Sequence, residues 1–121
     1  MNSKSRELEN RIQNVKQQLI ELGELHPGTL SKQYNVCGNP ACRCKATPPQ
    51  KHGPYYQLSW TRNRRSTSRF IQEQDVRTTR ERLANYKRLR ALIDQWIDAS
   101  VELSQLKLNQ SRAKSKAAKR S

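Results

Sequence analysis

The sequence lacks long apolar runs, and it has few aromatic and glycine residues. Of its 121 residues, only 33% are hydrophobic and 6% aromatic, and four are glycine. This composition argues against a large enzyme-like core and favours one small domain. No stretch approaches the length of a membrane span, and the N-terminal segment has no apolar signal-peptide region. We therefore expect a cytoplasmic protein, with no membrane contact, that needs something besides core burial to hold it together.

Acidic side chains are absent from residues 26–72. This stretch carries eight Lys and Arg residues, whereas residues 1–25 and 73–106 each contain equal numbers of basic and acidic side chains. The rest of the net charge of +14 lies in residues 107–121. Charge that served solubility alone would be spread over the helices as well. Its concentration in two segments favours a polyanionic partner.

A fourth cysteine is also absent, which argues against an iron–sulfur cluster, and three cysteines leave no complete disulfide pairing. All three, Cys37, Cys42 and Cys44, lie in the acid-free stretch, which also contains His52. Structural zinc takes four ligands, usually thiolates with up to two imidazoles. A close cysteine cluster in a reducing compartment favours metal binding. The sequence therefore predicts a Cys₃His site for Zn²⁺, in which the metal is structural.

Other interpretations of these residues stay open. His26 is an alternative fourth ligand, less favoured because it precedes an irregular segment, whereas His52 directly precedes a predicted hairpin. The cysteines could instead pack as small apolar residues. A redox or catalytic thiol is the third alternative, although no recognisable motif places a general base beside a cysteine. We predict no catalytic residues.

Helical periodicity flanks the acid-free stretch. Residues 1–24 are predicted to contain an amphipathic helix, and residues 73–108, without Pro or Gly, a longer one. The economical arrangement is an antiparallel, coiled-coil-like pair. The longer helix overhangs the shorter, and its apolar stripe indicates a homodimer or a protein partner. Residues 109–121 lack apolar periodicity and are expected to be disordered when unbound.

The segment 25–72 is predicted to form the zinc turn and a β-hairpin. Residues 25–34, with Pro27 and Gly28, are typical of an irregular crossing. The runs PYYQLSW and STSRFIQ are typical of strands, with TRNRR as a polar turn between them. By alternation, the core under the hairpin is expected to contain Tyr56, Leu58, Trp60 and Phe70. The fold class is therefore mainly α with a small β-hairpin.

The hairpin and the tail are the predicted nucleic-acid contacts. A two-stranded ribbon fits the major groove of DNA, and guanidinium groups contact phosphates or guanine edges. Aromatic side chains beside arginines also suit stacking on unpaired bases. The predicted contact residues are Arg43, Lys45, Lys51, Arg62, Arg64, Arg65, Arg69, Lys114, Lys116, Lys119 and Arg120.

These features together predict a non-enzymatic, zinc-stabilised nucleic-acid-binding protein, with DNA favoured over RNA. The alternative is an interaction module whose coiled helices bind a protein and whose basic charge is secondary. Steeply salt-sensitive DNA binding would separate the two.

Short motifs also resemble a family of small bacterial proteins catalogued as a domain of unknown function. The resemblance covers roughly residues 26–103 and rests on Gly28, Leu30, the run Cys37, Gly38, Pro40, Cys42 and Cys44, the HGPY motif at 52–55, Arg69-Phe70 and Asn85-Tyr86. Proteins of this kind occur in bacterial genomes, often near mobile elements and transposases. The resemblance implies a domain boundary, a mobile-element setting and a functional pairing of the cysteines with His52, and it supplies no activity.

Overall fold

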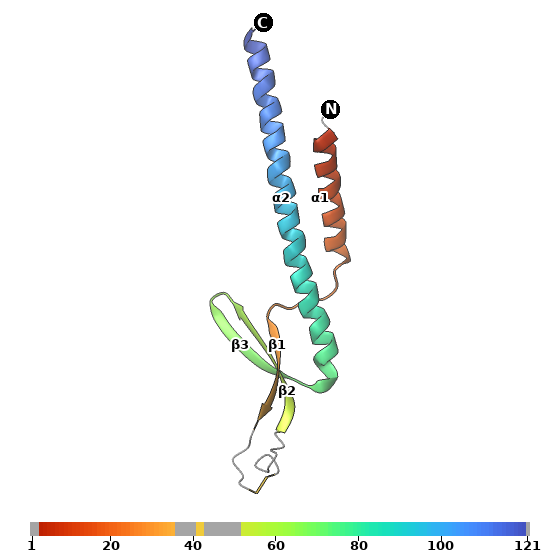
Figure 1. Ribbon diagram of the computed structural model, residues 1–121, viewed down its shortest axis with the longest axis vertical. Coiled ribbons are helices and arrows are strands. Elements are labelled where there is room, and N and C mark those ends of the chain that lie inside the picture. The colour runs from red at the N-terminus through yellow and green to blue at the C-terminus, as the bar shows by residue number, and fades with distance from the viewer. Residues whose placement is uncertain (1–2, 36–40, 43–51, 121) are drawn as a thin grey trace. The chain divides into compact units, whose positions relative to one another are not determined.

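The computed structural model describes residues 3–35, 41–42 and 52–120, with side chains for all of these except residue 35 and residues 117–120. The chain divides into a helical unit, residues 1–23 with 87–121, and a sheet unit, residues 24–86. Figure 1 shows the elements in chain order: α1 (Ser3–Glu21), β1 (Thr29–Asn35), β2 (His52–Arg62), β3 (Arg65–Ile71), a 3₁₀ turn (Glu73–Asp75) and α2 (Val76–Arg120). The expectation of a mainly helical chain with a small sheet is confirmed.

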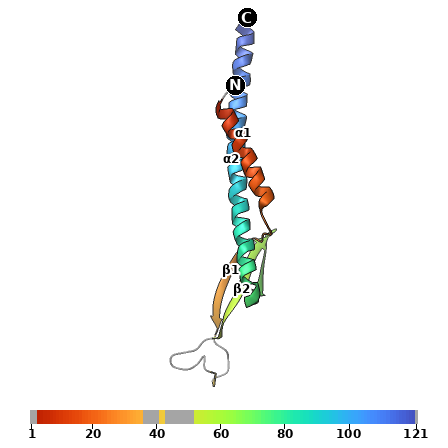
Figure 2. The ribbon, with the colours of Figure 1, turned by 90° about the vertical axis from the view of Figure 1, so that its right-hand side faces the viewer.

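The helical unit consists of α1 lying antiparallel beside α2 (Figures 1 and 2). Near the start of α1, Lys4 Nζ lies 3.6 Å from a carboxylate oxygen of Glu102. Near its end, Arg88 donates a hydrogen bond to the side chain of Gln18. The apolar side chains buried in this unit are Leu8, Val15, Leu92 and Ala99. Their burial follows from the helical spacing of the apolar residues.

α2 differs from the predicted helix at both ends. It begins at Val76, after the 3₁₀ turn, and continues to Arg120. The prediction of disorder is therefore wrong for residues 109–120. This segment contains Ala, Lys, Arg and Gln, which favour helix, and no Gly or Pro that would end one. Its missing apolar periodicity indicates only that it has no face to bury.

The sheet unit contains three antiparallel strands in the order β1-β2-β3, one strand more than predicted. The segment expected to be an irregular crossing forms β1 from Thr29 onward, and Leu30 pairs with Leu58 of β2. Pro27 and Gly28 disfavour regular structure only before Thr29, so the irregular crossing ends there and does not continue to residue 34.

Gly28 allows β1 to begin close to β2. Its φ is +113°, a conformation that favours glycine, and a Cβ at this position would lie 2.2 Å from the carbonyl oxygen of Ser59. Any larger residue would force the two strands apart. The glycine at this position is therefore required by the close approach of the backbones.

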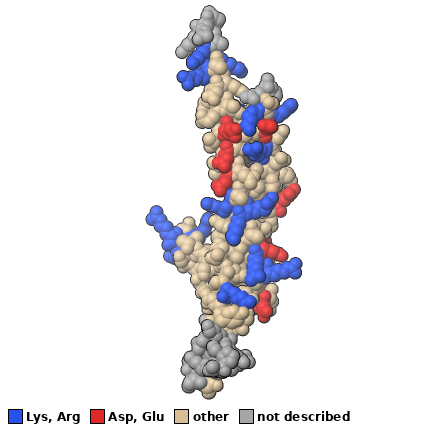
Figure 3. Space-filling model, in the orientation of Figure 1, with Lys and Arg blue, Asp and Glu red and all other residues tan. Residues whose placement is uncertain are grey.

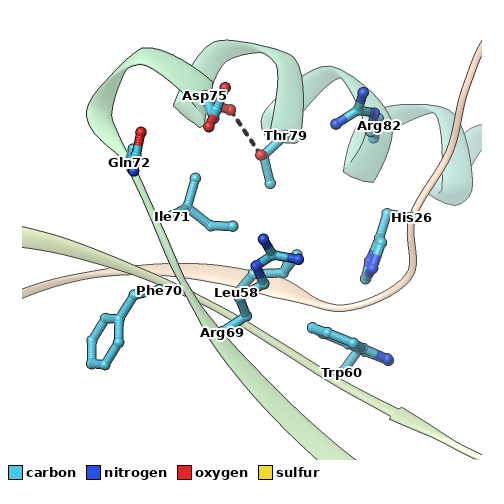
Figure 4. A pocket seen from close by; sticks show the side chains of 10 residues that line it. All are labelled: His26, Leu58, Trp60, Arg69, Phe70, Ile71, Gln72, Asp75, Thr79 and Arg82. Carbon is cyan, nitrogen blue, oxygen red and sulfur yellow. Dashed lines mark hydrogen bonds between the residues drawn. The ribbon is translucent and has the colours of Figure 1, made fainter.

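One face of the sheet packs against the beginning of α2. Leu58 of β2 is buried, and so are Val76, Thr79 and Leu83 on the first turns of α2. Figure 4 shows these turns lying over the strands, with Leu58 beneath them. The face of Leu58 is therefore the core side of the sheet, as the alternation in β2 predicts.

Phe70 does not belong to this core, contrary to the prediction. It pairs with Gln57, whereas Leu58 pairs with Arg69, and its side chain is 67% exposed. A five-residue turn over 61–65 would have placed Phe70 on the face of Leu58. The observed turn has only two residues, and this change reverses which side chains of β3 face the core.

Candidate nucleic-acid interface

The hairpin turn consists of Asn63 and Arg64, which join β2 directly to β3. Their φ angles are 53° and 64°, so both residues adopt the left-handed conformation that a type I′ two-residue turn requires. Arg62 and Arg65 pair with each other immediately before and after the turn. The turn therefore brings three arginines together within four consecutive residues; we call Arg62, Arg64 and Arg65 the arginine tip.

The arginine tip is exposed and takes part in no ion pair with the residues that the structure describes. Basic side chains gather visibly at the end of the hairpin in Figure 3. Three cations without carboxylate partners leave their positive potential available to an anion.

Arg64 occupies a backbone conformation that costs an L-residue roughly 1 kcal/mol. We expect Arg64→Gly to stabilise the hairpin, because Asn-Gly is a preferred pair for a type I′ turn. The melting temperature should rise by about 4 °C. The same change removes one cation, so the slope of log K for DNA against log salt should become shallower by about 0.9.

Arg65→Gly is the matched control for this change, since it removes the same charge from a strand position. It should lower the melting temperature, because glycine weakens a strand. Thermal unfolding of both variants by circular dichroism checks the prediction. A lower melting temperature for Arg64→Gly would contradict the assigned turn.

Arg69 lies on the core side of the sheet, away from the arginine tip. It borders a cavity of about 430 Å³ within the sheet unit, together with His26, Trp60 and Arg82 (Figure 4). Arg82 donates to a carboxylate oxygen of Glu24 at 2.8 Å, whereas no ion pair among the described residues includes Arg69. Arg69 is thus a separate cation rather than part of the tip.

His26 packs within the sheet unit. Its ring meets Trp60 edge to face at 4.6 Å, and Nδ1 lies 2.6 Å from the carbonyl oxygen of Pro27. The backbone N–H of His26 also donates to the carbonyl of Arg82. These contacts give His26 a packing role.

The other end of the hairpin carries a cysteine beside a histidine. The Cys42 Sγ atom lies 3.1 Å from Nε2 of His52. His52 begins β2 and pairs with Asn35, the last residue of β1. The chain therefore leaves the sheet at Asn35 and returns opposite it, so residues 36–51 connect two paired strand ends.

Gly53 follows His52 at the start of β2. Its φ is +134°, and a Cβ there would lie 2.8 Å from the carbonyl oxygen of Gln33. The close approach of β1 and β2 thus continues up to the histidine. This packing fixes the backbone that carries the imidazole.

Several predicted residues lie outside the described ones, namely Cys37, Cys44, Arg43, Lys45 and Lys51. Within the part of the chain that the structure describes, no three His, Cys, Asp or Glu side chains form a group that could hold a metal. Two of the four proposed zinc ligands, Cys42 and His52, are described, and these two lie together.

The basic tail residues lie on the last turns of α2. Lys114 and Lys116 are exposed, while the side chains of Lys119 and Arg120 lie outside the described ones. The described tail thus presents its charge to solvent from a helix.

The structure also reveals an exposed polar face of the sheet that was not among the predicted sites. Ser59 and Thr61 of β2 lie opposite Ser68 and Ser66 of β3, and their hydroxyl oxygens are 3.1 and 2.9 Å apart within each pair. The available signal was the period-two spacing of hydroxyl residues in both strands, which marks one polar face.

None of the described helices is both long and apolar enough to span a membrane. The long helix α2 has 45 residues, but charged side chains recur along its whole length.

Residues 5–81 match the family model "Domain of unknown function (DUF6788)". The chain belongs to the DUF6788 family. The DUF6788 match includes most of α1, the whole sheet and the first turns of α2, so it begins earlier and ends earlier than the resemblance noted over 26–103. Searches of curated proteins and of solved structures found no match.

Proposed function

We propose that this DUF6788 protein is a non-enzymatic, zinc-stabilised nucleic-acid-binding protein, and that its ligand is DNA rather than RNA. The observation that carries the proposal is the arginine tip, three exposed guanidinium groups without a carboxylate partner among the described residues. Guanidinium groups bind phosphates through paired hydrogen bonds, and phosphate contacts supply most of the affinity for nucleic acid.

The zinc part of the proposal is supported by the proximity of Cys42 and His52. A tetrahedral zinc ion separates a thiolate sulfur and an imidazole nitrogen by about 3.5 Å. The observed 3.1 Å needs only a small adjustment to reach that separation. The contacts of His26 with Trp60 favour His52 as the imidazole ligand.

Cys37 and Cys44 would complete the ligand set. Cys37 is two residues along the chain from Asn35, and Cys44 is two residues from Cys42. Both reference residues lie near this end of the sheet, and two peptide units span at most about 7 Å. Chain connectivity therefore allows all four ligands to meet. Zinc would supply structural order here, linking the ends of a segment with almost no apolar residues.

The setting of the protein belongs to the same proposal. A cytoplasmic location is part of this proposal, because a reducing compartment keeps thiols available for zinc. A bacterial host and an association with a mobile element are proposed from the sequence resemblance alone.

Binding of the unaltered protein to a labelled duplex tests the proposed function. Fluorescence anisotropy should show binding at low salt that weakens steeply and linearly on a log–log plot, because each neutralised phosphate releases counterions. The DNA should be recovered intact on a denaturing gel. Salt-independent binding, cleaved DNA, or no binding of either duplex or single-stranded DNA would each contradict the proposal.

A second candidate, a protein-interaction module, is favoured by an apolar stripe in the helical unit. Ile97, Val101 and Leu108 of α2 are 54%, 56% and 58% exposed, and Ile93 is 36% exposed. Their spacing places them along one side of the helix, where a second helix would bury them.

Val101→Glu tests this candidate. If the stripe pairs with a second copy, sedimentation velocity should show a dimer for the unaltered protein and a monomer for the variant, because dimerisation would bury the new charge. Gln95→Glu adds the same charge at another exposed position of α2 and should leave the dimer intact. A monomeric unaltered protein would remove the homodimer from the account.

A further inference from the structure

The uncovered side of the sheet has a chemical character of its own. It consists of alternate residues, from Tyr55 to Thr61 in β2 and from Ser66 to Phe70 in β3, and lies opposite to the side of Leu58. We call it the open face. The central positions of the open face are Ser, Thr and Gln. This face is therefore polar, in contrast to the core side.

Hydroxyl and amide groups fill the middle of the open face. Besides the two hydroxyl pairs described above, the Gln33 side chain donates to Oε1 of Gln57 at 3.0 Å. A hydroxyl both donates and accepts, and each amide has further donor and acceptor capacity. These groups can therefore bond to a ligand while keeping their contacts with each other.

Two aromatic side chains lie at the end of the open face away from the turn. Phe70 is 67% exposed and Tyr55 is 41% exposed. Gln57 pairs with Phe70, and Tyr55 is two residues from Gln57 on the same strand. Phe70 and Tyr55 are therefore diagonal neighbours on one face, a placement that lies within reach of aromatic side chains. Two adjacent exposed rings on a polar surface provide planar faces on which bases can stack.

The arginine tip lies at the opposite end of the same hairpin. Phe70 lies six positions along the chain from Arg64, and at the rise of an extended strand this corresponds to roughly 20 Å. The open face offers stacking surfaces and then hydrogen-bonding groups along this length, and the turn beyond it carries the cations, of which Arg62 and Arg65 lie on the same side of the sheet as Leu58. The whole acid-free stretch adds no carboxylate that would repel a phosphate backbone.

We propose that the open face binds a single strand of DNA, with unpaired bases stacked on Phe70 and Tyr55 and phosphates held near the arginine tip. This inference rests on the proposed function and specifies its substrate. Bases in a duplex are stacked on each other and offer no free face to an aromatic ring. A protein partner would be expected to bring apolar contacts, and the middle of this face is polar.

The test uses fluorescence anisotropy with oligothymidylate of about 12 nucleotides, within the range that small single-strand modules cover. A duplex of equal length and a matched oligouridylate RNA are compared under the same salt. The unaltered protein should bind the single-stranded DNA at least about tenfold more tightly than the duplex. Phe70→Ala and Tyr55→Ala should each weaken single-strand binding about tenfold and leave duplex binding within about twofold.

Two further variants separate stacking from folding. Phe70→Trp keeps a stacking surface and should retain single-strand affinity. Thr67→Ala alters an exposed residue of the same strand on the other face and should change neither affinity. Normal thermal unfolding of Phe70→Ala shows that the variant is folded.

The outcomes distinguish the two proposals. Binding to neither DNA form would overturn the proposed function and this inference together. Equal binding of both forms, unchanged by Phe70→Ala and Tyr55→Ala, would overturn this inference while duplex binding still supports the proposed function. Tighter binding of the RNA than of the DNA would overturn the assignment to DNA.

Discussion

Replacing Arg62, Arg64 and Arg65 together with alanine is expected to weaken duplex DNA binding between tenfold and a hundredfold at low salt. The reason is that three unpaired cations contribute through counterion release, each accounting for a slope of about 0.9 in log K against log salt. The triple variant should therefore show a slope shallower by about 2.7. Fluorescence anisotropy over a series of salt concentrations measures both quantities.

The matched control replaces Arg77, Arg80 and Arg90 of α2 with alanine. All three residues are exposed, so the control removes the same charge from another part of the chain. If affinity depends on the arginine tip, this control should keep most of the affinity and of the salt slope. Equal losses in the two triple variants would show that only net charge matters. That result would remove the hairpin from the interface.

His52→Ala and Cys42→Ser are expected to lose bound zinc and the ordered sheet unit. The two side chains lie 3.1 Å apart where the chain returns to the sheet. Removing one of four ligands from a structural site leaves an open, weak site, and metal binding contributes to the folding free energy of the unit that holds it. Zinc measured by elemental analysis should fall from about one per chain to a small fraction of that value.

His26→Ala is the control for metal loss, because His26 packs against Trp60. It should keep its zinc, whatever it costs in stability. If His26→Ala lost its zinc and His52→Ala kept it, the imidazole ligand would be His26 and not His52. Retention of zinc in both Cys42→Ser and His52→Ala would contradict the site.

The helical elements were predictable because their signals are local. Leu8 and Val15 recur at helical spacing, and both are buried. The end of α2 was not predicted, because the absence of an apolar stripe in residues 109–120 says nothing about helix propensity. Ala-rich and Lys-rich sequence can continue a helix without any partner.

The sheet was only partly predictable because its register depends on turn length. The alternation in β2 identified Leu58 as a core residue, but a turn of two residues instead of five moved Phe70 to the opposite face. Asn63 is a good type I′ residue, whereas Arg64 is not, so the residue types alone do not predict this turn. β1 was missed because its pairing with β2 joins segments separated by the cysteine stretch.

The candidate site was likewise only partly predictable from the sequence. The acid-free stretch and its arginines are visible in the sequence, as are the zinc-type ligands. Strand pairing places the arginines and the zinc-type ligands at opposite ends of one hairpin. It also exposes Tyr55 and Phe70 on the open face between these ends. The register of β2 with β3 depends on the length of the turn, and the pairing of β1 with β2 depends on tertiary packing, which no local pattern encodes.

The most direct test of the account is native mass spectrometry of the unaltered protein, purified without added metal and without a chelator. The account predicts one zinc ion per chain, removed by a strong chelator with loss of sheet structure and of DNA binding. A metal-free chain that keeps the same fold and the same DNA affinity would contradict it.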